Sequence, residues 1–532
     1  MQHVFIRANA AVDLGLGHIS RCRNIARVLT DNGATVSFFV DQIDEKIQSF
    51  LLNYKIMAIY SKSESFISQF DDAARFIRQM ERCGVPDVVI LDDYRLDVAW
   101  ETEVAQKSCA KIVAIDDVRR KHSADILIDT KWAGLNTQSR YDGLTNSDCL
   151  KLLGPQYLPL GHEYQAPETT TSQSATLKVV ISLGGGGSAE FLKEFCERFI
   201  EQISSTEDVS IVPVVGPYLM NQDLMHNLEF SYQKISPHYN PDGLFSILQD
   251  ADLFVGAAGG SLFEALSLRI PCLSFTLAEN QKNNIFDLQE VGNTFHVGFV
   301  CPPEIPKLAT LAHTMLQQLE RVQAICEKNR IVSIDANGCE RIYQAISSLF
   351  HRTETNEPVW TYPSGDVPSG YTFDTLPDAD LNYYLEARNL VNNKENMALT
   401  ETITSLDHML WWLSPNGREF FVLKQNGVPV VYVWQKCVEV TERVLIGGWF
   451  AATTMVSGVD AMNALQRQLS NTDAMFPGIR WLAVIRKTNS FTLLLNQRFN
   501  FEVIGEDDNL FHDARVHFPY ANPDEFLFLA RG

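Results

Sequence analysis

The sequence predicts two successive α/β lobes, each built on a parallel sheet, followed by a separate α+β domain. Short apolar runs alternate with helical stretches through most of the 532-residue chain, a pattern typical of parallel strands covered on both faces. Two segments rich in proline, glycine, serine or threonine interrupt the chain, at residues 166–176 and 353–370, and both resemble linkers. Beyond the second segment the pattern changes to antiparallel strands around a turn.

The elements follow in order along the chain. In the first lobe, strands are predicted at residues 4–6, 35–40, 87–91, 111–115 and 126–128. In the second lobe they are predicted at residues 178–183, 211–215, 252–255 and 272–275. The last domain is predicted to hold a helix at 380–390 and strands at 420–423 and 428–434, joined by a turn at 425–427. The predicted domains are therefore 1–165, 177–350 and 371–532.

Charge and cysteine usage limit the classes of partner and site. The formal net charge of −21 repels nucleic acid and anionic lipid, so neither nucleic acid nor a membrane is expected as a partner. The N-terminal residues 1–15 carry Arg7 and Asp13 and are expected to form a strand rather than a signal peptide. The ten cysteines are scattered singly, which predicts neither a metal site nor a disulfide framework and favours a reduced, cytoplasmic protein.

A first glycine-containing turn follows the first predicted strand. Gly15 and Gly17 precede His18, and an amphipathic helical stretch follows. Glycines let a ligand approach the backbone, and the helix start places unpaired N–H groups at the carboxyl edge of the sheet. A neutral imidazole at this helix end is a competent base near pH 7. The alternative is that His18 only caps the helix, and the sequence leaves both interpretations open.

The second lobe contains two further glycine turns. Four consecutive glycines, Gly184 and Gly185 to Gly187, follow a strand. Such a run is typical of a phosphate-binding loop, and the alternative is a flexible turn. The second turn precedes a predicted helix, and the candidate ligand-binding residues here and at the next strand end are Gly259, Ser261, Glu264, Asn280 and Gln281. Glu264 could accept hydrogen bonds from ribose hydroxyls, or it could be an acid that stabilises the helix start.

Asp92, Asp93 and Tyr94 end a strand on the same edge of the sheet as His18. They could orient the imidazole or bind a sugar. The alternative for the paired aspartates is capping of the following helix. Which carboxylate orients His18 is not decided by the sequence.

Taken together, these residues resemble the UDP-sugar hydrolases of pseudaminic acid biosynthesis. The resemblance spans about residues 1–350. Its matches are Arg7-Ala8-Asn9, Gly15-Leu16-Gly17-His18-Ile19, Arg21-Cys22, Asp92-Asp93-Tyr94, Ile115-Asp116-Asp117, Gly154-Pro155-Gln156-Tyr157, Ser182-Leu183-Gly184-Gly185, Ala257-Ala258-Gly259, Glu264, Asn280-Gln281 and Ile334-Asp335 to Arg341-Ile342.

The resemblance implies two Rossmann-like lobes of the GT-B type. It implies that His18 is the base that activates water at the anomeric carbon of a UDP-linked 2,4-diacetamido-2,4,6-trideoxy sugar. It also implies that the second lobe holds UDP, and that hydrolysis needs no cofactor or metal. The competing hypothesis is a glycosyltransferase of the same fold that uses a UDP-sugar donor. The sequence predicts neither the stereochemistry of the sugar nor the oligomeric state.

The C-terminal domain resembles GNAT-type acyltransferases. The matches include Leu385-Glu386-Ala387-Arg388-Asn389, Asn489-Ser490 before a helix, and Arg498-Phe499-Asn500-Phe501. The resemblance makes Gly458 and Asn489 candidate acyl-donor contacts and acetyl-CoA a candidate cofactor. Met455 and Asp460 depart from the usual pyrophosphate loop, because a carboxylate there competes for the amides that bind an anion. Weak or absent coenzyme A affinity, or a domain that only binds sugar nucleotide, is therefore also expected.

Overall fold

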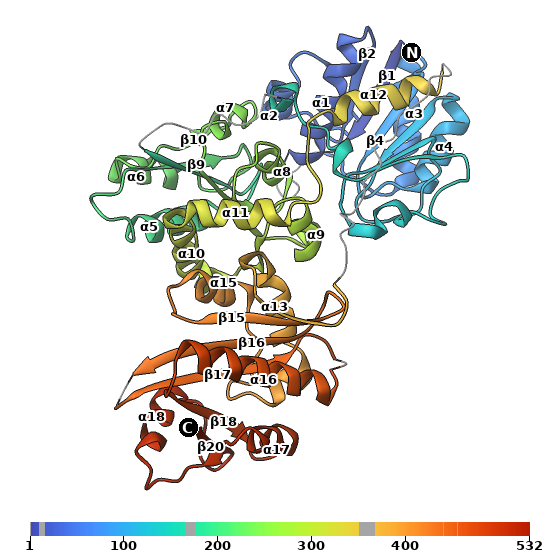
Figure 1. Ribbon diagram of the computed structural model, residues 1–532. Coiled ribbons are helices and arrows are strands. Elements are labelled where there is room, and N and C mark those ends of the chain that lie inside the picture. The colour runs from blue at the N-terminus through green and yellow to red at the C-terminus, as the bar shows by residue number, and fades with distance from the viewer. Residues whose placement is uncertain (1, 10–15, 166–175, 351–367, 440, 455) are drawn as a thin grey trace. The chain divides into compact units, whose positions relative to one another are not determined.

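The computed structural model describes the whole chain except residues 1, 10–15, 166–175, 351–367, 440 and 455 (Figure 1). The chain forms two compact units, Met1–Thr361 and Tyr362–Gly532. The first unit contains two parallel sheets, and the second contains one mixed sheet. The predicted fold class, two Rossmann-like lobes followed by an α+β domain, is confirmed. None of the helices described is both long enough and apolar enough to cross a membrane.

The first lobe is built on a parallel sheet in the order β3-β2-β1-β4-β5-β6-β7. Its strands are β1 (His3–Ala8), β2 (Thr35–Val40), β3 (Lys55–Ala58), β4 (Val88–Asp92), β5 (Lys111–Ile115), β6 (Ile126–Asp129) and β7 (Leu150–Leu153). The chain therefore leaves the sheet centre in one direction and later returns to extend it in the other. The reversal lies between β1 and β4.

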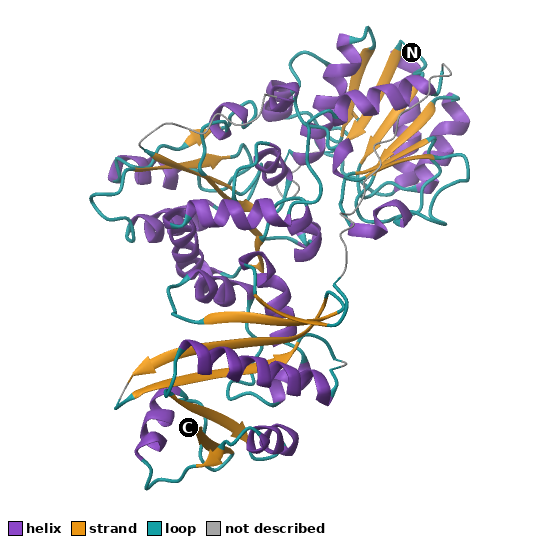
Figure 2. Ribbon diagram, viewed as in Figure 1, coloured by secondary structure: helices purple, strands orange, loops and turns teal. Residues whose placement is uncertain are grey.

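Helices cover both faces of this sheet (Figure 2). They are α1 (Gly17–Asp31), α2 (Glu45–Phe50), α3 (Gln69–Cys83) and α4 (Val98–Ser108). Along β1, Val4 and Ile6 pack in the core that contains α1, whereas Phe5 packs in the opposite core with residues of α3 and α4. Alternate residues of a strand point to opposite faces, so an apolar run is required where both faces are covered.

The second lobe repeats this design with the order β10-β9-β8-β11-β12-β13. Its strands are β8 (Leu177–Ser182), β9 (Val209–Val215), β10 (His238–Tyr239), β11 (Leu253–Ala257), β12 (Cys272–Thr276) and β13 (Phe295–Phe299). Its helices are α5 (Ala189–Ile200), α6 (Asp223–Ser231), α7 (Phe245–Leu248), α8 (Gly260–Ser267), α9 (Ile285–Glu290), α10 (Ile305–Gln317) and α11 (Leu319–Asn329). The order of strands reverses between β8 and β11.

The last helix of this unit, α12 (Gly338–Ser348), lies beside α1 rather than on the second sheet (Figure 1). Its apolar residues, among them Ile342 and Ile346, belong to the core of the first lobe. Arg341 donates to the main-chain oxygen of Gln156 and pairs with Asp335. The segment that resembles the hydrolases at residues 334–342 is thus used in packing.

The second unit has a seven-stranded sheet in the order β14-β15-β16-β17-β18-β20-β19. Its strands are β14 (Tyr371–Thr375), β15 (Glu419–Gln425), β16 (Val428–Glu439), β17 (Arg443–Ala451), β18 (Arg480–Arg486), β19 (Glu502–Val503) and β20 (Phe526–Arg531). Its helices are α13 (Leu381–Arg388), α14 (Val391–Glu395), α15 (Ser405–Leu413), α16 (Gly458–Met475), α17 (Ser490–Arg498) and α18 (Asn509–His517).

Two features of this sheet matter below. The predicted hairpin of β15 and β16 is present, and its turn residues Asn426 and Gly427 have φ of 49° and 77°, which suits the twist of a two-residue hairpin. Strands β17 and β18 are parallel, and they pair over residues 444–446 and 480–482.

Candidate active site

The candidate residues of unit 1 gather where the strand order of each sheet reverses. In open α/β sheets, ligands bind at the carboxyl ends of the strands at this switch point. In the first lobe, His18 follows β1 and Asp92 ends β4. In the second lobe, Gly184 follows β8 and Gly259 follows β11. Each pair comes from the two strands that flank a switch point.

His18 lies in the first turn of α1, with 7% of its surface exposed. Its Nδ1 lies 2.6 Å from Oδ1 of Asp92. A carboxylate only accepts, so Nδ1 carries the proton and the lone pair is left on Nε2. No hydrogen bond to Nε2 is formed by the residues that the structure describes. The imidazole is therefore oriented on one side and available to accept a proton on the other.

Asp92 is fully buried and contacts three side chains of α1, those of His18, Arg21 and Cys22. Besides His18, it accepts hydrogen bonds from Nε and Nη2 of Arg21 at 2.6 and 2.5 Å. Burial acts to raise the pKa of Asp92, but the Arg21 guanidinium and His18 hold it well below its ordinary value. Asp92 thus remains an anion beside the imidazole and stabilises positive charge there.

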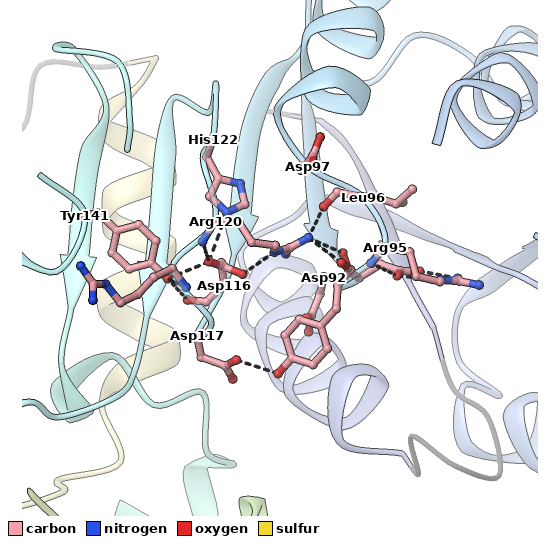
Figure 3. Close-up of polar contacts among 12 residues, drawn as sticks. Asp92, Arg95, Leu96, Asp97, Asp116, Asp117, Arg120, His122 and Tyr141 are labelled. Carbon is pink, nitrogen blue, oxygen red and sulfur yellow. Dashed lines mark hydrogen bonds and ion pairs between the residues drawn. The ribbon is translucent and has the colours of Figure 1, made fainter. Parts of the chain in front are cut away.

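Tyr94 and Asp117 complete this group of residues. The Tyr94 ring meets the His18 ring edge to face, with centroids 4.7 Å apart. Its hydroxyl donates to Asp117 Oδ1 at 2.7 Å, and this hydrogen bond is the dashed line at Asp117 in Figure 3. Arg21 Nη1 lies 3.3 Å from the other oxygen of Asp117. Asp117, which follows β5, thus contacts both Tyr94 and Arg21, and Arg21 is also bound by Asp92 of β4.

Asp93 points away from this group. Its carboxylate binds the guanidinium of Arg95, with Nη2 at 2.5 Å, and lies 3.7 Å from Arg7. Helix α4 is capped by Asp97, whose side chain accepts from the main-chain N–H of Ala99. Neither Asp92 nor Asp93 caps the helix, so the capping alternative is wrong for both. The adjacent aspartates serve opposite faces of the sheet.

A wider polar network supports the same sheet edge (Figure 3). Arg120 pairs with Asp116 at 2.8 Å and donates to the main-chain oxygens of Tyr94 and Leu96. These bonds fix the segment that follows β4. Tyr141 donates to Asp116, which thereby serves the network and not the group around His18.

The glycine run after β8 is held against the main chain of the same lobe. Gly184 and Gly187 have φ of 88° and 107°, which favours glycine. The main-chain oxygen of Gly185 accepts from Tyr218 N at 2.9 Å. A Cβ on Gly216 would lie 2.5 Å from the oxygen of Gly184. The run therefore has a defined conformation, and its amides precede α5, which is capped by Ser188.

We expect Gly216→Ala to destabilise unit 1 by about 1–3 kcal/mol, because the methyl group would displace the main chain of the glycine run. Thermal unfolding measures the effect. Gly259→Ala is the matched control, since a Cβ there meets nothing within 4 Å. Equal melting temperatures for the two variants would contradict the close contact between Gly216 and the main chain of Gly184 and Gly185.

Glu264 lies in α8, beyond Gly259 and Ser261 of the second turn. Its Oε2 is buried and has no hydrogen-bond partner in the part of the chain that the structure describes. Burial raises the pKa of Glu264 to about 7. The buried hydroxyl of the neighbouring Tyr164 acts in the opposite direction and lowers the pKa of Glu264. Ser261 receives a long hydrogen bond of 3.4 Å from Ser182. The carboxyl end of this sheet thus has a buried carboxylate oxygen, Oε2 of Glu264, that could accept a hydrogen bond from a ligand.

The other predicted residues are less informative. Gln281 lies in the short 3-10 helix Glu279–Gln281, and its Oε1 accepts from the main-chain N–H of Leu277. The side chain of Asn280 and all of Gly15 lie outside the described residues. Gly17 begins α1. The structure therefore brings together His18, Asp92 and Tyr94, and separately Gly184, Gly185, Gly259, Ser261 and Glu264.

Sequence reasoning did not select Arg21 and Asp117 as site residues. Arg21 lies three residues after His18, so the two side chains share one face of α1. Asp117 follows β5 at the same sheet edge as Asp92. Helical spacing and strand ends therefore carried a usable signal for both residues.

In unit 2, the two candidate acyl-donor contacts are at helix starts. Gly458 is the first residue of α16, and Asn489 caps α17 by accepting from Thr492 N at 3.1 Å. Asp460 binds the N–H and hydroxyl of Ser457 and accepts from the Tyr371 hydroxyl. A carboxylate thus occupies the first turn of α16, and Met455 lies outside the described residues.

No known protein-family profile matches the chain. It is 26% identical over 303 residues to an uncharacterized protein of Methanocaldococcus jannaschii, covering 55% of this chain and 59% of that relative. It is 20% identical to the spore coat polysaccharide biosynthesis protein SpsG of Bacillus subtilis, covering 66% of this chain and 99% of SpsG. It is 21% identical to the UDP-2,4-diacetamido-2,4,6-trideoxy-β-L-altropyranose hydrolase of Campylobacter jejuni, covering 54% and 97% of the two chains.

Two solved structures are also similar. The MurG protein of Acinetobacter baumannii aligns over 65% of this chain and 100% of its own, with 15% identity and a TM-score of 0.45. An N-acetyltransferase of Staphylococcus aureus Mu50 aligns over 30% of this chain and 96% of its own, with 19% identity and a TM-score of 0.24.

Proposed function

We propose that unit 1 hydrolyses a UDP-linked diacetamido-trideoxy sugar at its anomeric carbon, releasing UDP and the free sugar, in the biosynthesis of a nonulosonic acid of the pseudaminic type. The observation that carries the proposal is the buried pair of His18 and Asp92 at the switch point of the first lobe. It leaves Nε2 of His18 free to take a proton from water. The similarity to the hydrolase of Campylobacter jejuni and to the spore coat polysaccharide biosynthesis protein SpsG of Bacillus subtilis supports the substrate class.

The chemistry requires little beyond such a base. Breaking a glycosyl–phosphate bond places positive character on the sugar and negative charge on UDP, which is a good leaving group. Helix N-termini and glycine amides stabilise a departing phosphate. The starts of α5 and α8, with Gly184, Gly185 and Gly259, offer these groups in the second lobe. Water then needs only to be positioned and deprotonated.

Asp92 and Arg21 act on the base rather than on the substrate. Asp92 fixes the proton on Nδ1 and offsets the charge that forms on the imidazole when Nε2 accepts a proton. Arg21 keeps Asp92 ionised. Tyr94, packed against the imidazole, holds the ring plane.

The direct test is incubation of the purified protein with UDP-2,4-diacetamido-2,4,6-trideoxy-β-L-altropyranose, followed by ¹H and ³¹P NMR. We expect UDP and free sugar to form together without an added acceptor. Release of UDP only when an acceptor is present would instead show a glycosyltransferase, the competing function of the same fold.

Glu264→Gln is expected to weaken UDP binding by about tenfold to a hundredfold, with a smaller effect on the chemical step. A carboxylate whose Oε2 is unpartnered can accept from ribose hydroxyls, and hydrogen bonds to charged groups contribute about 1.5–3 kcal/mol. Calorimetric titration with UDP measures the change. Glu320→Gln, on the exposed surface of α11, is the matched control. Equal affinity in both variants would place the nucleotide elsewhere.

The same pair of variants reports the ionisation of Glu264. Its pKa in the folded chain, about 7, lies above the ordinary 4.5. The protonated, folded form is therefore favoured below pH 4.5, and this stabilisation is lost as the pH rises through 7. The melting temperature of Glu264→Gln should thus rise relative to that of the unmodified protein between these pH values and stay constant above them.

Residues 1–350 are expected to fold and to hydrolyse the sugar nucleotide without unit 2. All the groups assigned above to the reaction lie in this segment, and α12 completes the core of the first lobe within it. The truncated chain should show a single unfolding transition and unimpaired turnover. An inactive but folded fragment would mean that unit 2 contributes to the site.

For unit 2 we propose an acetyltransferase-like role with weak affinity for acetyl-CoA. The proposal is supported by the parallel pair β17 and β18, with α16 leading from one to the other. The Asp460 carboxylate in the first turn of α16 opposes a pyrophosphate at that helix start. Acetylation of the 4-amino group of the same sugar nucleotide would precede its hydrolysis.

A further inference from the structure

Unit 2 contains a cavity of about 1170 Å³ that is partly open to solvent. Its walls are formed by α13, α15 and α16 and by residues of β16, β17 and β18. Protein interiors are close-packed, with few voids larger than a water molecule. Sites for small molecules commonly enclose about 300–1,000 Å³. The cavity is therefore the size of a binding site rather than of a packing defect.

Two arginines line this cavity without an acidic partner. Arg388, at the end of α13, is 8% exposed. Its Nη2 donates to the main-chain oxygen of Leu399 at 2.7 Å, and its Nη1 is buried without a partner. Arg418 has a buried Nε that is likewise unpartnered. Among the described residues, no carboxylate forms an ion pair with either guanidinium.

Two arginines of the sheet strands show a contrast. Arg486 pairs with Glu525 and Arg531 pairs with Asp473, both at 2.8 Å. Two acidic residues, Glu401 and Asp407, also line the cavity, but neither pairs with Arg388 or Arg418. His408 adds no positive charge near neutral pH, because burial lowers its pKa to about 4.

The surroundings of Arg418 orient its hydrogen-bond donors. Its guanidinium lies over the rings of Trp411 and Trp434, 5.0 and 4.8 Å from their centroids. Stacking engages the faces of a guanidinium and leaves the N–H groups at its edge available. Burial lowers the pKa of both Arg388 and Arg418, and Tyr384 lies within electrostatic reach of both.

Removing a cation from water without a counter-charge is unfavourable, so the buried Arg388 and the partly buried Arg418, both without an acidic partner in a large cavity, indicate that a ligand supplies the negative charge. We propose that this cavity binds a small organic anion, through a carboxylate or phosphate group held by Arg388 and Arg418. Guanidinium groups bind both kinds of oxyanion with paired, charge-assisted hydrogen bonds. Gly458 and Asn489, the candidate acyl-donor contacts, line the same cavity, whereas the two arginines come from the end of α13 and from the residue just before β15. The proposal does not depend on hydrolysis by unit 1.

The test uses the full chain labelled with 5-fluorotryptophan, titrated with inorganic phosphate and separately with acetate in low-chloride buffer. ¹⁹F NMR separates the resonances of Trp411 and Trp434, assigned with Trp→Phe variants, from those of Trp100 and Trp132 in unit 1. Trp449 and Trp481 also line the cavity, but Trp411 and Trp434 lie against Arg418, so we expect the resonances of these two residues to move and to saturate. A stronger response to phosphate identifies a phosphoryl ligand, and a stronger response to acetate identifies a carboxylate ligand.

Arg388→Gln with Arg418→Gln should weaken this response at least about tenfold, while the exposed Arg467→Gln leaves it unchanged. If the double variant does not fold, Arg418→Lys and Arg418→Gln are compared, because lysine keeps the charge and should keep most of the response. The proposal would be overturned if neither anion changes the ¹⁹F chemical shifts at concentrations up to about 100 mM, or if the change persists when both arginines are replaced.

Discussion

Replacing His18 with alanine is expected to lower the turnover number for UDP release by about 10²–10⁴-fold while UDP affinity stays nearly unchanged. His18 lies after β1 at the switch point of the first lobe, and its Nε2 is free to accept a proton. The groups proposed to bind UDP lie in the other lobe. Rates under saturating substrate and calorimetric titration with UDP separate the two effects.

His238→Ala is the matched control, because His238 is exposed on β10. It should leave both turnover and UDP affinity intact. Added imidazole is expected to restore part of the activity of His18→Ala, since the variant lacks only the proton acceptor. Near-normal turnover by His18→Ala would contradict the assignment of the base.

Asp92→Asn is expected to lower the turnover number by about 10²–10⁴-fold, with little change in UDP affinity. The neutral amide neither holds the proton on Nδ1 of His18 as firmly nor stabilises the charge that forms on the imidazole. It also leaves Arg21 without its closest anion. The separate measurement of kcat and KM tests this, because a positioning residue affects chiefly kcat.

Asp93→Asn separates this role from folding. Asp93 is the adjacent residue and is equally buried, but it binds Arg95 and lies beside Arg7 instead of His18. Both variants should lower the melting temperature, whereas the folded fraction of Asp93→Asn should retain its turnover. Equal loss of turnover in the two variants would show that Asp92 acts through the fold alone.

Most of the strands of unit 1 could be predicted from the sequence, and those missed there have one physical cause. In unit 2 the prediction covered only the strands β15 and β16. The predicted strands of unit 1 are the central ones, which are apolar because both faces are covered. The four strands that were missed, β3, β7, β10 and β13, are the edges of the two sheets. Edge strands are short and pair on one side only, so their sequences need no continuous apolar run.

The site was predictable only in part, because a sequence does not show which side of a strand end faces a ligand. Alternation along β4 places Asp92 on the face of α1 and Asp93 on the opposite face. This inference requires knowing that β4 continues to Asp92. Arg388 belongs to a segment that resembles the acyltransferases, but neither Arg388 nor Arg418 was selected as a site residue, since only the folded chain reveals that they lack acidic partners. The effect of Asp460 on an anionic ligand stays a prediction, and the structure shows that Asp460 takes part in capping α16.

The proposed reaction is tested most directly by hydrolysis in H₂¹⁸O with mass analysis of both products. Activation of water by His18 for attack at the anomeric carbon requires that ¹⁸O enter the free sugar at C1 and that UDP remain unlabelled. The label should be absent from both products when His18→Ala is incubated for the same time. Label in the β-phosphate of UDP, or a changed sugar nucleotide without release of UDP, would contradict attack at the anomeric carbon.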